Sequence, residues 1–225
     1  MPTLHGHPMS PYVRKVRIAL AEKSIEAESN PIVHFALPEG YEKLHPLRKI
    51  PVWTTDAGEH IPDSSVIIAY LDKVQPSPRL IPDDPVLFAR ALFLEEFADS
   101  AFSMGIAQIF LEQFAAPLFM NRATDQAVVE KALHKTLPPL FAHLDQTIGA
   151  RPFMVGETFS IADIAIASPL NNLRHTGIPI DAETYPNLRR YADQIITRPS
   201  VAGIFAAEVA EYGGESPEAA ARKSA

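Results

Sequence analysis

Apolar positions recur with two different periods along the chain, and the change of period divides it. Up to about residue 80, short strand-like runs alternate with amphipathic helical ones, whereas later residues follow the helical period almost throughout. The pattern predicts an α/β domain over residues 1–80 and an all-helical domain over residues 86–212. Residues 74–85 lie between them and contain four of the 21 prolines, a composition typical of an extended linker.

The N-terminal pattern predicts alternating strands and helices. The expected strands are residues 3–6, 26–34, 51–55 and 59–61, and the expected helices are residues 11–23 and 63–74. Asp56-Ala57-Gly58 has the length and glycine content of a hairpin loop between the last two strands. The order βαβ and then ββα predicts a mixed four-stranded sheet with helices packed against it.

The C-terminal pattern predicts several helices. These are residues 86–116, ended by Pro117; residues 124–148, interrupted at Pro138-Pro139; a helix starting after Ser160; residues 185–196; and a shorter helix after Val201. Ser160 and Asp163 have the S-x-x-D spacing of a capping box. Residues 213–225 have no apolar face and are predicted to be a mobile tail.

Composition narrows the class of function. The formal charge of −7 and the pI near 5.6 argue against a nucleic-acid or anionic-membrane binder. The absence of cysteine excludes thiolate, disulfide and CxxC zinc chemistry by this chain. His5 and His7 have no third ligand nearby, so we expect no metal. No apolar run approaches the roughly 20 residues of a spanning helix, and we expect a cytoplasmic protein.

Ser10 precedes Pro11 at the start of the first expected helix. Proline is best tolerated at the first helical position, which makes Ser10 the natural N-cap. The same helix start carries unpaired N–H groups and the positive end of the helix dipole, so a thiolate or carboxylate would be stabilised there. Tyr12 supplies a second hydroxyl close by.

Two further segments can bind a ligand. In Lys49-Ile50-Pro51 the proline starts a strand, and it is either an ordinary trans strand-entry proline or a cis-proline that turns the Ile50 backbone outward. The residues alone favour trans, because only about 5–6% of X–Pro bonds are cis. Asp63 and Ser64 precede an apolar helix, where they can cap it and also hold a zwitterionic amino-acid head group.

Five segments together resemble the glutathione S-transferase superfamily. They are SPYVRKVRIAL, LRKIPVW, PDSSVIIAYLD, FSIADIAIA and YPNLRRYADQIITRPSV, and the match runs from about Thr3 to Phe205. The resemblance, to serine-type members such as the tau and zeta classes, implies a thioredoxin-like N-terminal domain, a helical-bundle C-terminal domain and a homodimer. Glutathione is then the implied co-substrate.

The resemblance also implies residue roles. Ser10 would donate its hydroxyl to the glutathione sulfur, and Pro51 would be the family's cis-proline, with Ile50 bonding the cysteinyl backbone. Lys49 matches a position that reaches the glycyl carboxylate, and Asp63 and Ser64 match the Glu-Ser pair that holds the γ-glutamyl group. Asp63 is one methylene shorter than the usual Glu.

The implied activity is transfer of the glutathione thiolate to an electrophilic, largely apolar small molecule, as in detoxification. Tyr12, Phe102 and Met104 are candidates for the second-substrate pocket, although the last two can equally be core residues. The alternatives are a glutathione-dependent isomerase, ether-cleaving or dehalogenating enzyme, and a non-enzymatic interaction module. The family resemblance implies Ser-Ser-Cys at this site in the maleylacetoacetate isomerase branch, whereas this chain has Ser-Pro-Tyr at residues 10–12.

Overall fold

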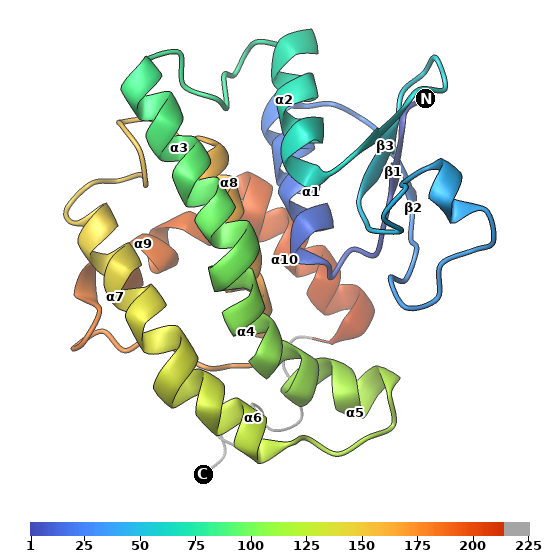
Figure 1. The fold of residues 1–225 in the computed structure, drawn as a ribbon. Helices are drawn as coiled ribbons and strands as arrows, with labels where there is room; N and C mark the ends of the chain where they lie inside the picture. Colours follow the sequence, from blue (N-terminus) through green and yellow to red (C-terminus); the bar gives the residue numbers. More distant parts are fainter. Residues whose placement is uncertain (214–225) are drawn as a thin grey trace. The chain divides into compact units, whose positions relative to one another are not determined.

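The computed structural model describes residues 1–213, apart from the side chains of residues 118 and 119. The chain forms two compact units, one from Met1 to Asp83 and the other beginning at Asp84 (Figure 1). Gly213 follows the last described helix, and the rest of the predicted tail lies outside the described residues.

The first unit contains the predicted mixed four-stranded sheet. Its strands are β1 (Thr3–His5), β2 (Glu28–Asn30), β3 (Val52–Thr54) and β4 (His60–Pro62), in the order β2-β1-β3-β4. β1 pairs in parallel with β2, while β1–β3 and β3–β4 are antiparallel. The hairpin at Asp56-Ala57-Gly58 and the βαβ–ββα order are confirmed.

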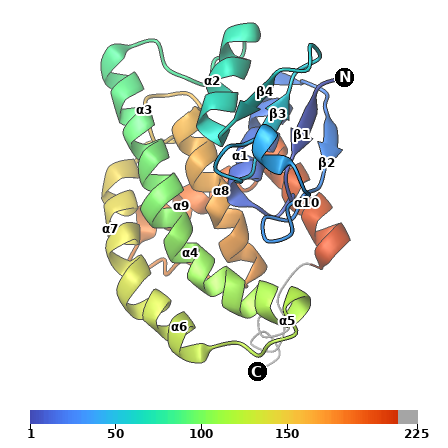
Figure 2. The same ribbon diagram turned by 45° about the vertical axis from the view of Figure 1, so that its right-hand side comes forward.

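Two helices pack together against one face of this sheet, α1 (Pro11–Lys23) and α2 (Ser64–Val74) (Figures 1 and 2). Both bury an apolar stripe, which includes Val16 on α1 and Ile67 on α2, each fully inaccessible to solvent. A short 3₁₀ helix, η1 (Tyr41–Lys43), lies in the long connection between β2 and β3. The first unit is therefore thioredoxin-like, as expected.

The end of α1 is anchored by a buried cation. The Lys23 ammonium donates to Asp72 Oδ1 at 2.8 Å and to the carbonyls of Gln75 and Pro78, both at 2.7 Å. These are as many acceptors as the ammonium has N–H groups. Asp72 in turn accepts from the amide of Leu80 at 2.8 Å, so the pair holds the proline-rich segment after α2.

The second unit is all-helical, as expected. Its elements are α3 (Pro85–Phe97), η2 (Ala98–Phe102), α4 (Ser103–Phe110), η3 (Leu111–Ala115), α5 (Ala116–Phe119), α6 (Gln126–Lys131), η4 (Ala132–Thr136), α7 (Leu137–Ile148), α8 (Ile161–His175), α9 (Pro186–Ile195) and α10 (Pro199–Tyr212). The segments η2, η3 and η4 are π-helical turns that join neighbouring α-helices.

The effects of the prolines and the length of the last helix differ from the sequence prediction. Pro117 does not end its helix, because it lies in the first turn of α5, where a missing N–H costs least. Pro138-Pro139 similarly fall in the first turn of α7, directly after a π-helical turn, so the interruption is a change of hydrogen-bond register. The helix expected to be short after Val201 is α10, with 14 residues.

The predicted capping box at the start of α8 is confirmed. The Asp163 carboxylate is fully buried and accepts from the Ser160 amide and hydroxyl, the Met154 amide and the Tyr191 hydroxyl, at 2.8 to 3.1 Å. Burial raises the Asp163 pKa to about 6, although these hydrogen bonds oppose the change. The carboxylate therefore connects α8, α9 and the preceding loop. None of the helices within residues 1–213 is long and apolar enough to cross a membrane.

Candidate functional site

Ser10 occupies the N-cap of α1, as predicted. Its backbone is extended, and its Oγ accepts from the Val13 amide at 3.5 Å. Among the hydrogen bonds of residues 1–213, the Ser10 hydroxyl donates none. The half-buried hydroxyl thus keeps its proton available for an acceptor placed at the helix start.

The Ile50–Pro51 peptide bond is cis. The expectation of trans from the residues alone is therefore wrong, and the cis-proline implied by the family resemblance is found. Tyr41, fully buried, donates its hydroxyl to the Lys49 carbonyl at 3.0 Å and so supports the loop from inside. Within residues 1–213, neither the amide nor the carbonyl of Ile50 makes a backbone hydrogen bond, so both are open to an extended ligand.

Asp63 is the N-cap of α2 and has a positive φ of 77°. Its Oδ1 accepts from the amides of Ser65 at 2.9 Å and Val66 at 3.3 Å. In the part of the chain that the structure describes, Oδ2 accepts no hydrogen bond. One carboxylate can therefore cap the helix through one oxygen and offer the other to an ammonium group. Ser64 is buried beside it, with 2% of its surface exposed.

Two hydrogen bonds, together with close packing at Gly6, bring these segments together. The Asp63 amide donates to the Pro51 carbonyl at 3.3 Å, which joins the cis-proline to the start of α2. Lys15 Nζ on α1 lies 3.3 Å from Ser65 Oγ on α2. Gly6, at the end of β1, has a φ of 144° and no room for a side chain.

The crowding at Gly6 places the Ile50 loop against the first helix. A Cβ atom on Gly6 would lie 2.4 Å from Val13 Cγ2 and 3.2 Å from Ile50 Cβ. Ile50 is therefore adjacent to the first turn of α1, which Ser10 caps. The structure brings Ser10, the Lys49–Pro51 segment and Asp63-Ser64 to one region of the first unit.

His45 was not identified from the sequence. It is buried, with 7% of its surface exposed, and its Nδ1 accepts from the Leu47 amide at 3.1 Å. The pKa of His45 is lowered, mainly by burial. The negative charge of Asp63 opposes this change, and the positive charge of Lys49 adds to it. His45 thus lies close to both charged candidates, and no spacing in the sequence signals this, because the contact depends on the loop's path.

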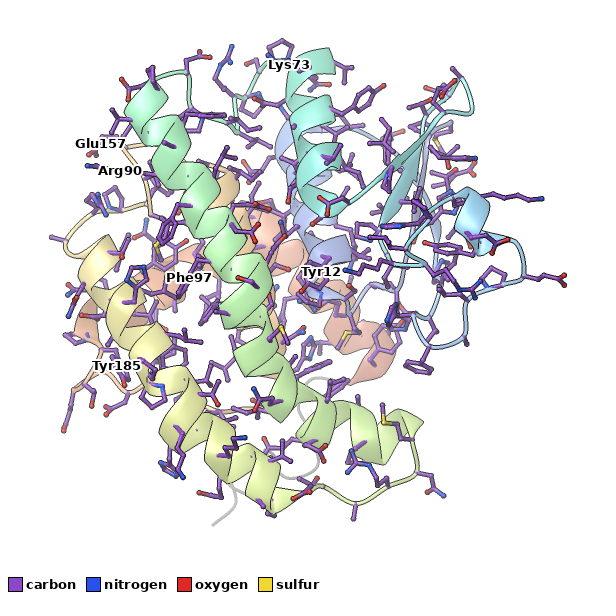
Figure 3. The ribbon with its side chains drawn as sticks, in the orientation of Figure 1. Tyr12, Lys73, Arg90, Phe97, Glu157 and Tyr185 are labelled. Atoms are coloured by element: carbon purple, nitrogen blue, oxygen red, sulfur yellow. The ribbon has the colours of Figure 1, made fainter. Side chains whose placement is uncertain are left out.

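The two candidates for the second-substrate pocket in the second unit, Phe102 and Met104, differ in exposure. Phe102 is fully buried and packs against Phe97 and Phe141, with ring centroids 6.5 and 6.1 Å away, so its place is in the core of the second unit. Met104 is 65% exposed. Tyr12 lies half-buried on α1, and Phe97 lies on α3 (Figure 3). A pocket role remains a prediction for Tyr12 and Met104.

His5 is one of the two histidines considered as metal ligands. Both of its ring nitrogens lie within hydrogen-bonding distance of other side chains. Its Nε2 lies 2.8 Å from Thr54 Oγ1, and its Nδ1 lies 2.9 Å from Asn30 Nδ2. Across residues 1–213, no three His, Asp or Glu side chains gather into a group that could hold a metal ion.

Comparison with known proteins identifies the family. Residues 4–79 match the family model described as "Glutathione S-transferase, N-terminal domain". Residues 110–207 match the model described as "Glutathione S-transferase, C-terminal domain". The chain belongs to the glutathione S-transferase superfamily. The N-terminal match contains Ser10, Lys49, Ile50, Pro51, Asp63 and Ser64.

Individual relatives carry several functional names within this superfamily. A glutathione S-transferase from Methylobacillus flagellatus KT, solved with glutathione bound, is 32% identical, with a TM-score of 0.72 and coverage of 91% of this chain and 98% of that one. A maleylacetoacetate isomerase from Rattus norvegicus is 28% identical over 83% of this chain and 84% of its own. The FtsZ-localized protein A from Caulobacter vibrioides is 25% identical over 78% of each chain.

Proposed function

We propose that this protein binds glutathione in its first unit and transfers the glutathione thiolate to an electrophilic, largely apolar small molecule. The observation that carries the proposal is the convergence of the Ser10 helix start, the Ile50–Pro51 segment and the Asp63 helix start near Gly6. A tripeptide thiol needs separate partners for its sulfur, its backbone and its two charged ends, and these segments supply them.

Each segment has a chemical role in this proposal. The open amide and carbonyl of Ile50 bond the cysteinyl backbone in the manner of a paired strand. Asp63 Oδ2 accepts from the γ-glutamyl ammonium, and the Ser64 hydroxyl bonds the neighbouring carboxylate. Lys49 is exposed on the same loop and attracts the glycyl carboxylate. The relative solved with glutathione bound supports this choice of ligand.

Ser10 favours the ionised form of the thiol. A free thiol has a pKa near 8.5, so at neutral pH only a few per cent is thiolate. Each unit of depression requires about 1.4 kcal/mol. The hydrogen bond from Ser10 and the dipole of α1 can together supply about one or two units, and two units would convert most of the bound thiol to the nucleophilic thiolate at neutral pH.

The test removes the hydroxyl while retaining the fold. Ser10→Ala should lower kcat with 1-chloro-2,4-dinitrobenzene at least tenfold and raise the apparent thiol pKa in the pH profile of kcat/KM, because the thiolate loses its donor. Ser10→Thr keeps a hydroxyl and an N-cap and should retain most activity. Ser29→Ala, an exposed serine on β2, controls for loss of a hydroxyl elsewhere.

Two results would refute the assignment. Unchanged turnover in Ser10→Ala would exclude Ser10 as the thiolate donor. A tenfold loss in Tyr12→Phe, with Ser10→Ala unaffected, would transfer the role to Tyr12.

A glutathione-dependent isomerase is a second candidate, favoured by the 28% identity to the rat maleylacetoacetate isomerase. The motif after Ser10 is Pro-Tyr, which differs from the Ser-Cys of that branch. Isomerisation of a maleylacetoacetate-type substrate, with only traces of conjugation, would select this candidate. If millimolar glutathione fails to raise the Tm and no conjugation occurs, the chain is instead a non-enzymatic interaction module.

We also propose that the protein is a homodimer. Phe88 and Leu92 are four residues apart on α3, so they share one face of the helix, and they are 40% and 37% exposed. Apolar side chains on one helix face are typical of a surface covered by a partner. Light scattering should give twice the 24.7 kDa chain mass, and Phe88→Glu should reduce the mass to that of one chain.

A further inference from the structure

A pocket in the second unit has no part in the proposed glutathione site. It has a volume of about 510 Å³ and lies among α8, α9, α10 and the turn before α9 (orange to red in Figures 1 and 2). Its walls are mainly apolar and include Leu173, Ile180, Ile196, Phe205 and Val209. A cavity of 300 to 1,000 Å³ with apolar walls and a few polar groups is typical of a small-molecule site.

Two arginines line this pocket, and one of them is satisfied by the protein. Arg189 Nε donates to both carboxylate oxygens of Asp193, at 2.9 and 2.8 Å, and Nη1 donates to the Ile180 carbonyl at 3.3 Å. The charge of Arg189 is therefore balanced by Asp193, which also lines the pocket. This pair contributes little net attraction for a ligand.

The second arginine, Arg174, is held in place but poorly satisfied. Its Cζ lies 3.6 Å from the ring centroid of Phe205, so the guanidinium stacks on a wall of the pocket. Nη1 donates to Asn171 Oδ1 at the long distance of 3.5 Å, which is the one hydrogen bond that the guanidinium makes within residues 1–213. A guanidinium has five N–H donors, so most of those on Arg174 have no acceptor there.

The surroundings of Arg174 contain one buried acid. Burial lowers the pKa of Arg174, and the charge of Glu208 partly opposes this. Glu208 Oε2 lies 3.2 Å from His175 Nε2. Glu208 and His175 are therefore within hydrogen-bonding distance of each other. Among the contacts of residues 1–213, no hydrogen bond joins Arg174 to Glu208. The half-buried guanidinium thus presents open donors beside an apolar cavity.

We propose that this pocket binds a small aromatic carboxylate, whose carboxylate pairs with Arg174 and whose ring system lies against the apolar walls. Arginine bonds a carboxylate through two parallel N–H groups, and such charge-assisted pairs are the stronger class of hydrogen bond. The stacking on Phe205 fixes the guanidinium before binding, which reduces the entropy lost when the pair forms.

The proposal is independent of the proposed glutathione chemistry. Every lining residue belongs to the second unit, whereas Ser10, Pro51 and Asp63 belong to the first. Ser10→Ala should therefore leave binding of the carboxylate unchanged.

Titration calorimetry on the full chain tests the proposal with 1-naphthoate and its neutral analogue 1-naphthamide. We expect 1-naphthoate to bind at least tenfold more tightly than the amide. Arg174→Met, which keeps the aliphatic stem, should remove that preference, and Arg174→Lys should restore part of it. Arg190→Met is the matched control, because Arg190 is on α9 but bonds the Gly149 and Arg151 carbonyls outside the pocket.

Val209→Phe tests the location, since a larger side chain at the pocket wall should weaken both compounds. The Tm of each variant shows whether the fold is retained. Equal affinity of the wild-type chain for the acid and the amide would overturn the proposal without recourse to any variant. Undiminished 1-naphthoate binding in a folded Arg174→Met or Val209→Phe variant would overturn it too, because the acid would then bind elsewhere.

Discussion

The buried Asp163 at the start of α8 makes the stability of this protein depend on pH in a predictable direction. Its pKa is about 6 in the folded chain, against an ordinary value of 3.8. Between pH 3.8 and about pH 6, Asp163 therefore keeps its proton in the folded state and has mostly lost it in the unfolded state. Asp163 therefore contributes stability that is complete below pH 3.8 and is lost as the pH rises through about 6.

The magnitude follows from the size of the pKa change. The full difference of about 2 pKa units corresponds to roughly 3 kcal/mol, and the part lost between pH 4.5 and 7.5 is about 2 kcal/mol. Asp163→Asn removes this titration. It also costs about 1–3 kcal/mol at every pH, because the amide nitrogen cannot accept from the Met154 or the Ser160 N–H that faces it.

The assay is urea unfolding followed by far-UV circular dichroism from pH 4.5 to 7.5. The destabilisation caused by Asp163→Asn should shrink by about 2 kcal/mol as the pH rises. Tyr191→Phe should behave in the opposite way. It removes the 3.0 Å bond from the Tyr191 hydroxyl to Asp163 and should cost about 1 kcal/mol more at pH 7.5 than at pH 4.5.

The opposite slopes separate a charge effect from a packing effect, which would be the same at every pH. If the two variants differed from wild type by constant amounts across this range, burial would not control the Asp163 pKa, and the reasoning would be refuted.

Three further changes test the first unit. Lys23→Met should cost about 3–5 kcal/mol in urea unfolding followed by Trp53 fluorescence, because it leaves the buried Asp72 carboxylate without its cation; a loss under 1 kcal/mol would contradict this. Gly6→Ala should cost about 2–5 kcal/mol and weaken glutathione binding in calorimetry, since its Cβ would lie 2.4 Å from Val13 Cγ2. Gly58→Ala, with a φ of 85° and open space around it, is the control and should leave binding intact. Asp63→Asn should leave the Tm nearly unchanged, because Asn caps helices as well as Asp, but weaken glutathione binding about tenfold as the charge facing the ammonium is lost. Equal affinity of the variant and the wild-type chain for glutathione would exclude Asp63 from the site.

Local rules account for most of the helices and strands that the sequence predicts. Ser10 before Pro11, Asp63 before an apolar run and Ser160 with Asp163 are all N-caps in the structure, because capping depends on residues within one turn of each other. Proline was less predictable. Pro117 is typical of a helix end, yet the π-helical turn η3 ends directly before α5, and Pro117 falls in the first turn of α5.

The candidate site shows the same division. The sequence by itself determined the two-part chain, the helix starts at Ser10 and Asp63 and, through the combination of motifs, the superfamily. The family resemblance implied a cis Ile50–Pro51 bond that the residues alone did not favour. The tertiary structure alone decided that Gly6 brings Ile50 against the first helix and that His45 lies near Asp63. The open guanidinium of Arg174 belongs to this second group. Each depends on which distant segments meet, and a periodic pattern of apolar residues specifies a face of an element but not its neighbour.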